Sequence, residues 1–184
     1  MTELRSLCVY CGSRAGNEPS FSDTAVELGR LTAKDGVRLI YGGGDRGLMG
    51  ATASAARDAG GDVLGIIPTF ITATEGLLEG IPVIEVETMH ERKIRMFDEA
   101  DAFCALPGGI GTLEETIEVL SWANLKLHRK PIILCNTAGY WSPLVELIER
   151  VNAFGFGYPG LRETITIVDT PDAVLPAARK ALKS

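Results

Sequence analysis

The chain has 184 residues, of which 46% are hydrophobic and 23% charged, a globular composition that argues against intrinsic disorder. Acidic residues outnumber basic ones by 24 to 18, and no block of like charge stands out, which disfavours a nucleic-acid partner but leaves room for a local anion site. No apolar stretch approaches membrane-spanning length and the N-terminus lacks the apolar region of a signal peptide, so we expect a cytoplasmic protein without a membrane partner.

Short runs rich in β-branched residues alternate with helical segments along the chain. The expected strands are residues 6–11, 37–41, 63–67, 82–86, 102–106, 131–135 and 164–168. The expected helices are residues 20–34, 48–59, 89–100, 112–127, 142–151 and 171–183, and the connection 68–81 has room for a short helical turn. Most strand runs are apolar without strict alternation, which indicates parallel strands covered on both faces. The pattern predicts an α/β fold, a Rossmann-like doubly wound sheet of about seven strands, in one domain over residues 1–184.

In such sheets, ligands bind beyond the carboxyl ends of the strands. The loops of interest are therefore residues 12–19, 42–47, 68–80, 107–111 and 136–141.

The cysteines favour a structural role. Cys8, Cys11, Cys104 and Cys135 each lie in or at the end of a strand-like run. Cys8 and Cys11 form a C-x-x-C, but residues three apart in a strand point to opposite faces, and a redox motif of this kind opens a helix. We expect buried free thiols in a reducing compartment. With only two histidines in the chain, we expect no metal centre.

The first glycine-rich loop follows the second strand. Gly42, Gly44 and Gly47 satisfy G-x-G-x-x-G, the pattern of a dinucleotide site. The next strand ends without an acid for the ribose, because Asp62 starts that strand and so lies at the opposite end of the sheet. Two interpretations remain: a turn that lets a ligand approach the backbone, or a purely structural tight turn.

The second glycine-rich loop, residues 106–115, reads L-P-G-G-I-G-T-L-E-E. A buried strand runs into three glycines, and a helix is expected to begin at Thr112. Its first amides can hold a phosphate, assisted by the positive end of the helix dipole. The alternative is a helix cap, in which Thr112 and Glu115 form a capping box. Capping explains neither the glycine run nor the second carboxylate, Glu114.

A third cluster lies on the helix expected from residue 89. Met89, Arg92, Lys93 and Met96 share one helix face, so two cations lie within a partly apolar stripe. Neither cation has an acid three or four residues away. Their counter-charge is therefore expected from elsewhere in the fold or from an anionic ligand, unless the two side chains extend along the surface to water.

These motifs together resemble one family. Residues 107–115 match the P-G-G-x-G-T-x-x-E signature of the LONELY GUY (LOG) proteins, cytokinin-activating phosphoribohydrolases whose bacterial relatives often hydrolyse AMP. Residues 89–93, M-H-E-R-K, resemble the family's M-H-x-R-K segment, and residues 42–50 resemble its first glycine loop. The likeness extends from Cys8 to roughly the last helix. Such proteins are often labelled lysine decarboxylases, but the sequence carries no pyridoxal-binding signature.

The resemblance implies a Rossmann-like homodimer with active sites near the subunit interface. It implies hydrolysis of cytokinin riboside 5′-monophosphates, and of AMP, to the free base and ribose 5-phosphate, without a cofactor. It assigns Arg92 and Glu115 to catalysis. The residues that it assigns to substrate binding are Gly108, Gly109, Gly111 and Thr112 at the phosphate, Lys93 and Glu114 along the nucleotide, Ser13, Gly43 and Gly44 on the first two loops, and Glu75 before the arginine helix. The loop around Glu75 departs from the family's usual pattern.

The chemistry fits these roles, because cleavage of a nucleosidic bond builds positive charge on the ribose, which a carboxylate such as Glu115 can stabilise. The main alternative is a non-catalytic carrier of related fold that binds a nucleotide or a molybdenum cofactor. A dehydrogenase is a more distant alternative. Trp122, Leu125 and Leu127, late in the same helix as Glu115, offer apolar surface for the expected dimer.

Overall fold

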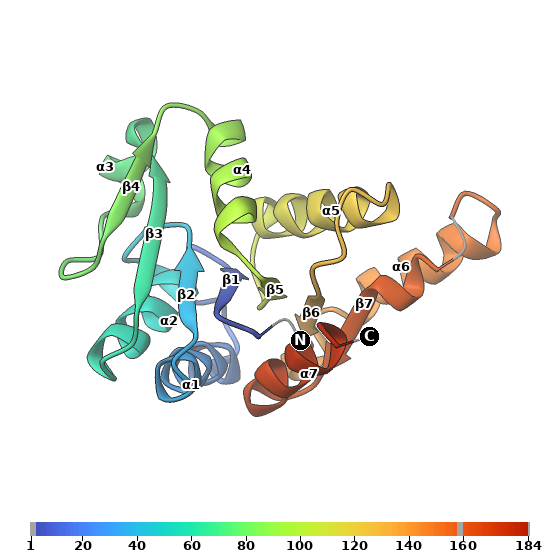
Figure 1. The fold of residues 1–184 in the computed structure, drawn as a ribbon, viewed down its shortest axis with the longest axis horizontal. Helices are drawn as coiled ribbons and strands as arrows, with labels where there is room; N and C mark the ends of the chain where they lie inside the picture. The colour runs from blue at the N-terminus through green and yellow to red at the C-terminus, as the bar shows by residue number, and fades with distance from the viewer. Residues whose placement is uncertain (1–2, 158–159, 184) are drawn as a thin grey trace.

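A computed structural model describes residues 3–157 and 160–183 of the chain. Its centre is a seven-stranded sheet whose neighbouring strands all run parallel (Figure 1). The strands are β1 (Ser6–Tyr10), β2 (Arg38–Tyr41), β3 (Val63–Pro68), β4 (Val83–Val86), β5 (Ala102–Ala105), β6 (Ile132–Cys135) and β7 (Ile165–Val168). Their order across the sheet is β4-β3-β2-β1-β5-β6-β7, so the winding reverses between β1 and β5. A crevice is expected at this switch point.

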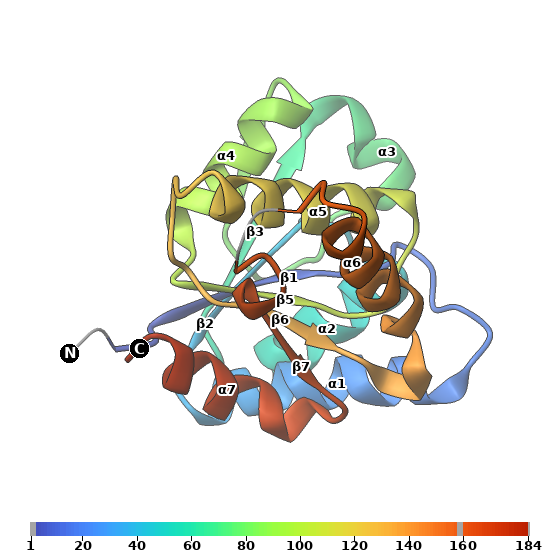
Figure 2. The ribbon, with the colours of Figure 1, turned by 90° about the vertical axis from the view of Figure 1, so that its right-hand side faces the viewer.

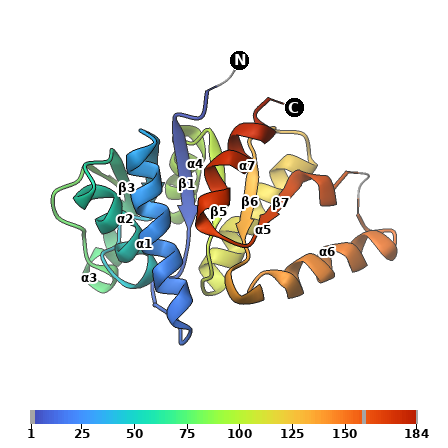
Figure 3. The same cartoon turned by 90° about the horizontal axis from the view of Figure 1, so that it is seen from below.

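Helices cover both faces of the sheet. They are α1 (Pro19–Lys34), α2 (Gly47–Asp58), α3 (Thr72–Glu75), α4 (Met89–Glu99), α5 (Ile110–Asn124), α6 (Ser142–Ala153) and α7 (Val174–Ala181). Figure 2 shows α4, α5 and α6 on one side of the sheet and α1 and α7 on the other. Figure 3, seen from below, has α1 and α7 in front of the central strands. The predicted doubly wound α/β fold is therefore confirmed.

The core is split by the sheet into two apolar layers. Successive residues of a strand point to opposite faces, so Leu7 and Val9 of β1 belong to one layer and Cys8 and Tyr10 to the other. The first layer packs against α1, α2 and α7, and the second against α4, α5 and α6. β1 is buried along its whole length, which explains its continuous apolar run.

The predicted elements are present with ends shifted by at most three residues, and the connection 68–81 holds a 3-10 turn, Thr69–Ile71, followed by α3. One shift changes an interpretation. Helix α5 begins at Ile110, with Gly109 as its N-cap, so Thr112 lies inside the first turn. The predicted start at Thr112 was wrong because Ile110 and Gly111 already have helical backbone.

The four cysteines are buried free thiols, as predicted. Cys8 and Cys11 lie in opposite apolar layers, so the C-x-x-C residues do not face each other. Asp62 accepts a hydrogen bond from Arg38 at the start of β2, far from the carboxyl ends of the strands, which agrees with the argument against a dinucleotide site. Within residues 3–157 and 160–183, no helix is long and apolar enough to cross a membrane.

Candidate functional site

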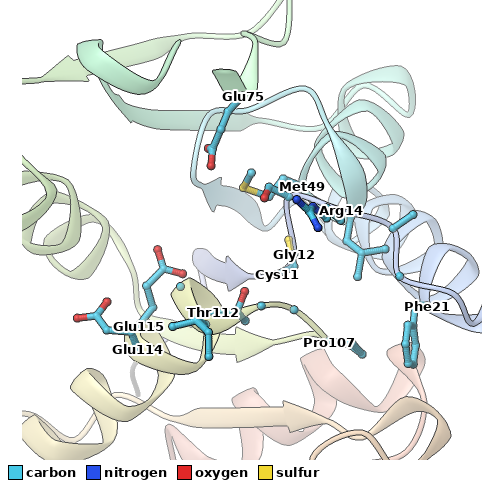
Figure 4. A pocket seen from close by; sticks show the side chains of 18 of the residues that line it. Cys11, Gly12, Arg14, Phe21, Met49, Glu75, Pro107, Thr112, Glu114 and Glu115 are labelled. Atoms are coloured by element: carbon cyan, nitrogen blue, oxygen red, sulfur yellow. The ribbon is translucent and has the colours of Figure 1, made fainter. Parts of the chain in front are cut away.

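A cavity of about 660 Å³ opens at the carboxyl ends of the strands, where the loops after β1 and β5 meet. Figure 4 shows the side chains around it. The wall combines glycines from the loops after β1 and β5, two arginines, three glutamates and several apolar side chains. Its residues are Cys11, Gly12, Ser13, Arg14, Ala15, Gly16, Asn17, Phe21, Leu48, Met49, Ile71, Glu75, Met89, Arg92, Pro107, Gly108, Gly109, Ile110, Gly111, Thr112, Glu114, Glu115 and Tyr140.

The second glycine loop forms one wall. The Gly12 amide donates to the carbonyl of Pro107 at 3.0 Å, which holds the loops after β1 and β5 together. A Cβ at Gly108 would overlap the Thr112 hydroxyl and lie 2.8 Å from the Gly12 nitrogen, so only glycine fits there. Past Gly109 the chain enters α5, whose first amides have no helical partner and border the cavity. This wall is suited to an anion.

The capping-box alternative is wrong. The N-cap of α5 is Gly109, which has no side chain, and no side-chain cap hydrogen bond is present. Thr112 lies in the first turn, where its hydroxyl packs against Gly108 and borders the cavity. Glu115, in the second turn, is too far along the helix to cap it. The two residues therefore face the cavity for a reason other than helix capping.

Glu115 is a buried carboxyl group on the cavity wall, 9% exposed. Burial raises its pKa from 4.5 to about 7 because the charged form loses hydration; Arg92 opposes this shift, and Glu114 and Glu75 reinforce it. A carboxyl group with a pKa near neutrality can change protonation state during a reaction. In Figure 4 the side chains of Glu115 and Glu75 extend into the cavity from opposite sides.

Arg92 is the buried cation of the site, at 6% exposure. Its guanidinium donates to the carbonyls of Ile66, at 3.1 Å, and Gly42, at 3.0 Å. A Cβ at Gly42 would overlap this guanidinium, so the first glycine loop makes room for it. In the part of the chain that the structure describes, no carboxylate forms an ion pair with Arg92. Its charge is therefore available to a ligand in the cavity.

Lys93 has its counter-charge within the fold. Its ammonium group lies 2.5 Å from Glu114 and 2.9 Å from Glu118, both on α5. Burial lowers the pKa of Lys93, but the hydrogen bonds to Glu114 and Glu118 more than compensate, and the net direction is upward. Lys93 is not among the cavity-lining residues, whereas Glu114 is. Lys93 therefore contacts the cavity wall through its ion pair with Glu114 and does not itself line the cavity.

The other predicted binding residues divide into two groups. Ser13 and Glu75 border the cavity, and one carboxylate oxygen of Glu75 is buried without a hydrogen-bond partner among the described residues. Gly43 and Gly44 do not line the cavity. Gly43 has a φ of +84° and packs against Ile67, and Gly44 lies against the backbone of Glu75. These two glycines shape the turn behind the wall.

Sequence reasoning missed several lining residues. Arg14 enters from the β1–α1 connection, Phe21 from the first turn of α1, Met49 from α2, and Tyr140 from the loop after β6. Only Arg14 carried a signal, as a cation on a loop beyond a strand. Cys11 also lines the cavity, but burial raises its pKa far above neutrality, so it remains a thiol and is a poor nucleophile. Among the described residues, no group of three or more potential ligands could hold a metal ion.

A protein family described as "Possible lysine decarboxylase" matches residues 49–178. The described cavity does not suit the pyridoxal cofactor that this description implies. That cofactor is held as an imine on a lysine, and no lysine lines the cavity in the described ranges. Lys93, which follows the lining residue Arg92 in the chain, forms ion pairs with two carboxylates.

The curated relatives carry another name. The chain is 46% identical over 173 residues to "Probable cytokinin riboside 5'-monophosphate phosphoribohydrolase LOGL9" of Oryza sativa subsp. japonica, covering 94% of this chain and 75% of the relative. It is 44% identical over 172 residues to "Cytokinin riboside 5'-monophosphate phosphoribohydrolase LOG3" of Arabidopsis thaliana, covering 92% and 79%.

A solved structure of the molybdenum cofactor carrier protein from Chlamydomonas reinhardtii superposes with a TM-score of 0.76 over 99% of this chain and all of the other. At 18% identity, that likeness concerns the fold alone. The matches to the curated relatives span more than nine tenths of this chain, at 44–46% identity. The chain belongs to the LOG family.

Proposed function

We propose that this protein hydrolyses the N-glycosidic bond of AMP and of cytokinin riboside 5′-monophosphates, its N6-substituted counterparts, releasing the free base and ribose 5-phosphate. One observation carries the proposal: the buried Glu115 carboxyl group, with its pKa near 7, shares a cavity with the open N-terminus of α5 and with Arg92. The names of the relatives point to the same reaction. The test is the release of adenine from AMP by the purified protein.

The phosphate is placed at the N-terminus of α5. Amides of Gly109 and Gly111 and the hydroxyl of Thr112 supply donors, while Gly108 allows close approach. Ser13, on the neighbouring loop after β1, adds a hydroxyl to the same end of the cavity. Binding energy from this remote group positions the sugar for the reaction.

Glu115 and Arg92 act at the sugar and the base. As the C1′–N9 bond breaks, its electron pair leaves with the base, which takes up a proton. The Glu115 carboxylate stabilises the positive charge that develops on the ribose, and a water oxygen then bonds to C1′ and gives up a proton. Arg92 keeps Glu115 ionised in part and is available to the leaving base. No metal or cofactor takes part in this scheme.

The remaining wall residues bind the nucleoside. Glu75, with its unpartnered buried oxygen, accepts a hydrogen bond from the substrate. Glu114 borders the nucleotide and is held in place by Lys93. Met49 and Met89 provide apolar surface for the base. Gly43 and Gly44 act indirectly through the turn that places Arg92 and Glu75. The buried free thiols fit a reducing, cytoplasmic setting.

The 5′-phosphate is expected to be essential. Compared with AMP, adenosine should lose kcat as well as affinity, with kcat/KM lower by about 100-fold or more, because the remote phosphate orients the ribose. Treatment with a chelator and omission of NAD should leave the rate unchanged. Steady-state kinetics on both substrates measure this. Equal kcat/KM values for adenosine and AMP, or inactivation by the chelator, would contradict the proposed site.

The protein is also expected to be a homodimer with its sites near the interface. Leu125 and Leu127, at the end of α5, are 57% and 69% exposed, and Ile117 on the same helix is 42% exposed. Trp122 contributes less, because its ring packs edge-on against Phe97 within the subunit. Burial of the exposed side chains by a second copy would remove apolar surface from water. Light scattering should give about twice the 19.7 kDa chain mass at micromolar concentration; a single-chain mass would rule the dimer out.

A further inference from the structure

Tyr140 sits between two aromatic rings at the edge of the cavity. Its ring meets Phe21 edge-on, with centroids 5.9 Å apart, and Trp141 edge-on at 5.0 Å. Trp141 is itself fixed, because its indole N–H donates to the carbonyl of Ala105 at 3.0 Å and its amide donates to the Asn136 side chain at 2.7 Å. The position of the Tyr140 hydroxyl is therefore set by the loop after β6.

Among the residues that the structure describes, that hydroxyl has one hydrogen-bond partner. It donates to the carbonyl oxygen of Gly108, 2.5 Å away and 32 residues earlier in the chain. The Gly108 carbonyl and the Gly109 amide belong to the same peptide unit, which is planar and trans, so the two groups point in opposite directions. A donor that holds the carbonyl on one side fixes the N–H on the other. The Gly109 amide makes no hydrogen bond within the described ranges, and Gly109 lines the cavity.

Two adjacent glycines make this peptide easy to reverse. Gly109 has a φ of −90°, and reversal of the peptide would carry it to about +90°, a value that glycine adopts without steric cost. The reversed peptide would present a carbonyl oxygen, rather than an N–H, to the anion. A side chain at position 108 would clash with Thr112 and Gly12, so this residue must be glycine and its backbone stays free to rotate. Because position 109 is also glycine, a hydrogen bond from outside the loop can hold the peptide in one orientation.

We propose that Tyr140 is a positioning residue of the phosphate site: its hydroxyl locks the Gly108–Gly109 peptide in the orientation that aims the Gly109 amide at the phosphate. This rests on the proposed function, which assigns a phosphate to the N-terminus of α5. Tyr140 acts through the peptide and needs no contact with the substrate. Loss of the Tyr140 hydroxyl should therefore weaken the binding of phosphorylated ligands and leave the binding of the free base unchanged.

The test is Tyr140→Phe, which removes the hydroxyl and keeps both ring contacts. The matched control is Tyr41→Phe, because the Tyr41 hydroxyl is buried without a partner among the described residues and lies outside the cavity. Calorimetry with Tyr140→Phe should give a Kd for ribose 5-phosphate raised about tenfold and a Kd for adenine within about twofold of wild type. Tyr41→Phe should match wild type for both ligands.

The backbone gives a second readout. In wild type, the Gly109 amide resonance should shift when ribose 5-phosphate is added; in Tyr140→Phe without ligand it should be broadened or doubled by peptide reversal. An unchanged Kd would overturn the proposal, as would equal losses for adenine and ribose 5-phosphate. Selective loss with a wild-type Gly109 resonance would also overturn it, since that outcome assigns the hydroxyl to direct phosphate contact. Adenine release is assayed separately, so failure of the hydrolase proposal is visible independently of these results.

Discussion

Glu115→Gln is expected to lower kcat for AMP by about 100-fold or more. Glutamine keeps the size and hydrogen-bonding capacity of the side chain but cannot carry negative charge toward the developing ribosyl cation. Because Glu115 is not part of a helix cap, the structure gives no reason for the helix itself to weaken. The measurement is adenine release under saturating AMP, together with a denaturation curve.

The pH dependence of kcat tests whether the negative charge of Glu115, rather than the size of its side chain, supports the reaction. With a Glu115 pKa of about 7, kcat should rise with pH through that value as the carboxylate forms, and Glu115→Gln should lack this limb. The control is Glu27→Gln, the same change on the exposed face of α1, away from the cavity, where Glu27 pairs with Arg30. It should keep kcat within about twofold of wild type. Near-normal turnover in Glu115→Gln would leave the proposed mechanism without its central residue.

Stability should follow the opposite trend with pH. Below pH 4.5 the Glu115 carboxyl group is protonated in both the folded and the unfolded state. Between pH 4.5 and about 7 the folded state retains a proton that the unfolded state has lost, so the free energy of unfolding falls as pH rises. The loss amounts to about 3 kcal/mol above pH 7. Glu115→Gln should match wild type within about 1 kcal/mol at pH 5 and exceed it at pH 8.

Arg92→Ala is expected to be comparably damaging, with kcat lowered by about 100-fold. It removes the positive charge opposite Glu115 and leaves the carbonyls of Ile66 and Gly42 without their donors, so we also expect a loss of about 1–3 kcal/mol in unfolding free energy. Because Arg92 lowers the pKa of Glu115, the rising limb of the pH–rate profile should move to higher pH in this variant.

Arg92→Lys is the informative comparison. Lysine keeps the charge, so the limb should stay near pH 7, while the paired donation to two carbonyls is lost. A full pH–kcat profile of both variants measures this. If Arg92→Ala turns over AMP at the wild-type rate, or leaves the limb unmoved, then Arg92 has neither a catalytic nor an electrostatic role at Glu115.

The sequence predicted those features of the fold that depend on residues close together in the chain. Apolar runs and their spacing predicted the strands and helices, and the glycine run after β5 predicted one of the loops that line the cavity. The start of α5 was misplaced because Thr112 is a better cap than Gly109 by residue type, whereas in the structure the helix already begins at Ile110.

Contacts between distant segments were beyond prediction. The partners of Lys93 lie 21 and 25 residues further along the chain, on a different helix. Tyr140 reaches Gly108 across 32 residues and carried no sequence signal of its own. The raised pKa of Glu115 comes first from burial and then from charges that include Arg92 and Glu75, which lie on other elements of the fold. The sequence therefore predicted part of the cavity lining, such as Arg92, Thr112 and Glu115, and the structure added the contacts that hold these residues.

The most direct test of the proposed function is product analysis with the wild-type protein. Purified protein is incubated with AMP and, separately, with N6-isopentenyladenosine 5′-monophosphate, and both the free base and ribose 5-phosphate are quantified. Hydrolysis at the N-glycosidic bond predicts the two products in equal amounts, without added metal or cofactor. A protein that binds AMP yet returns it intact would contradict the account and favour a non-catalytic nucleotide carrier.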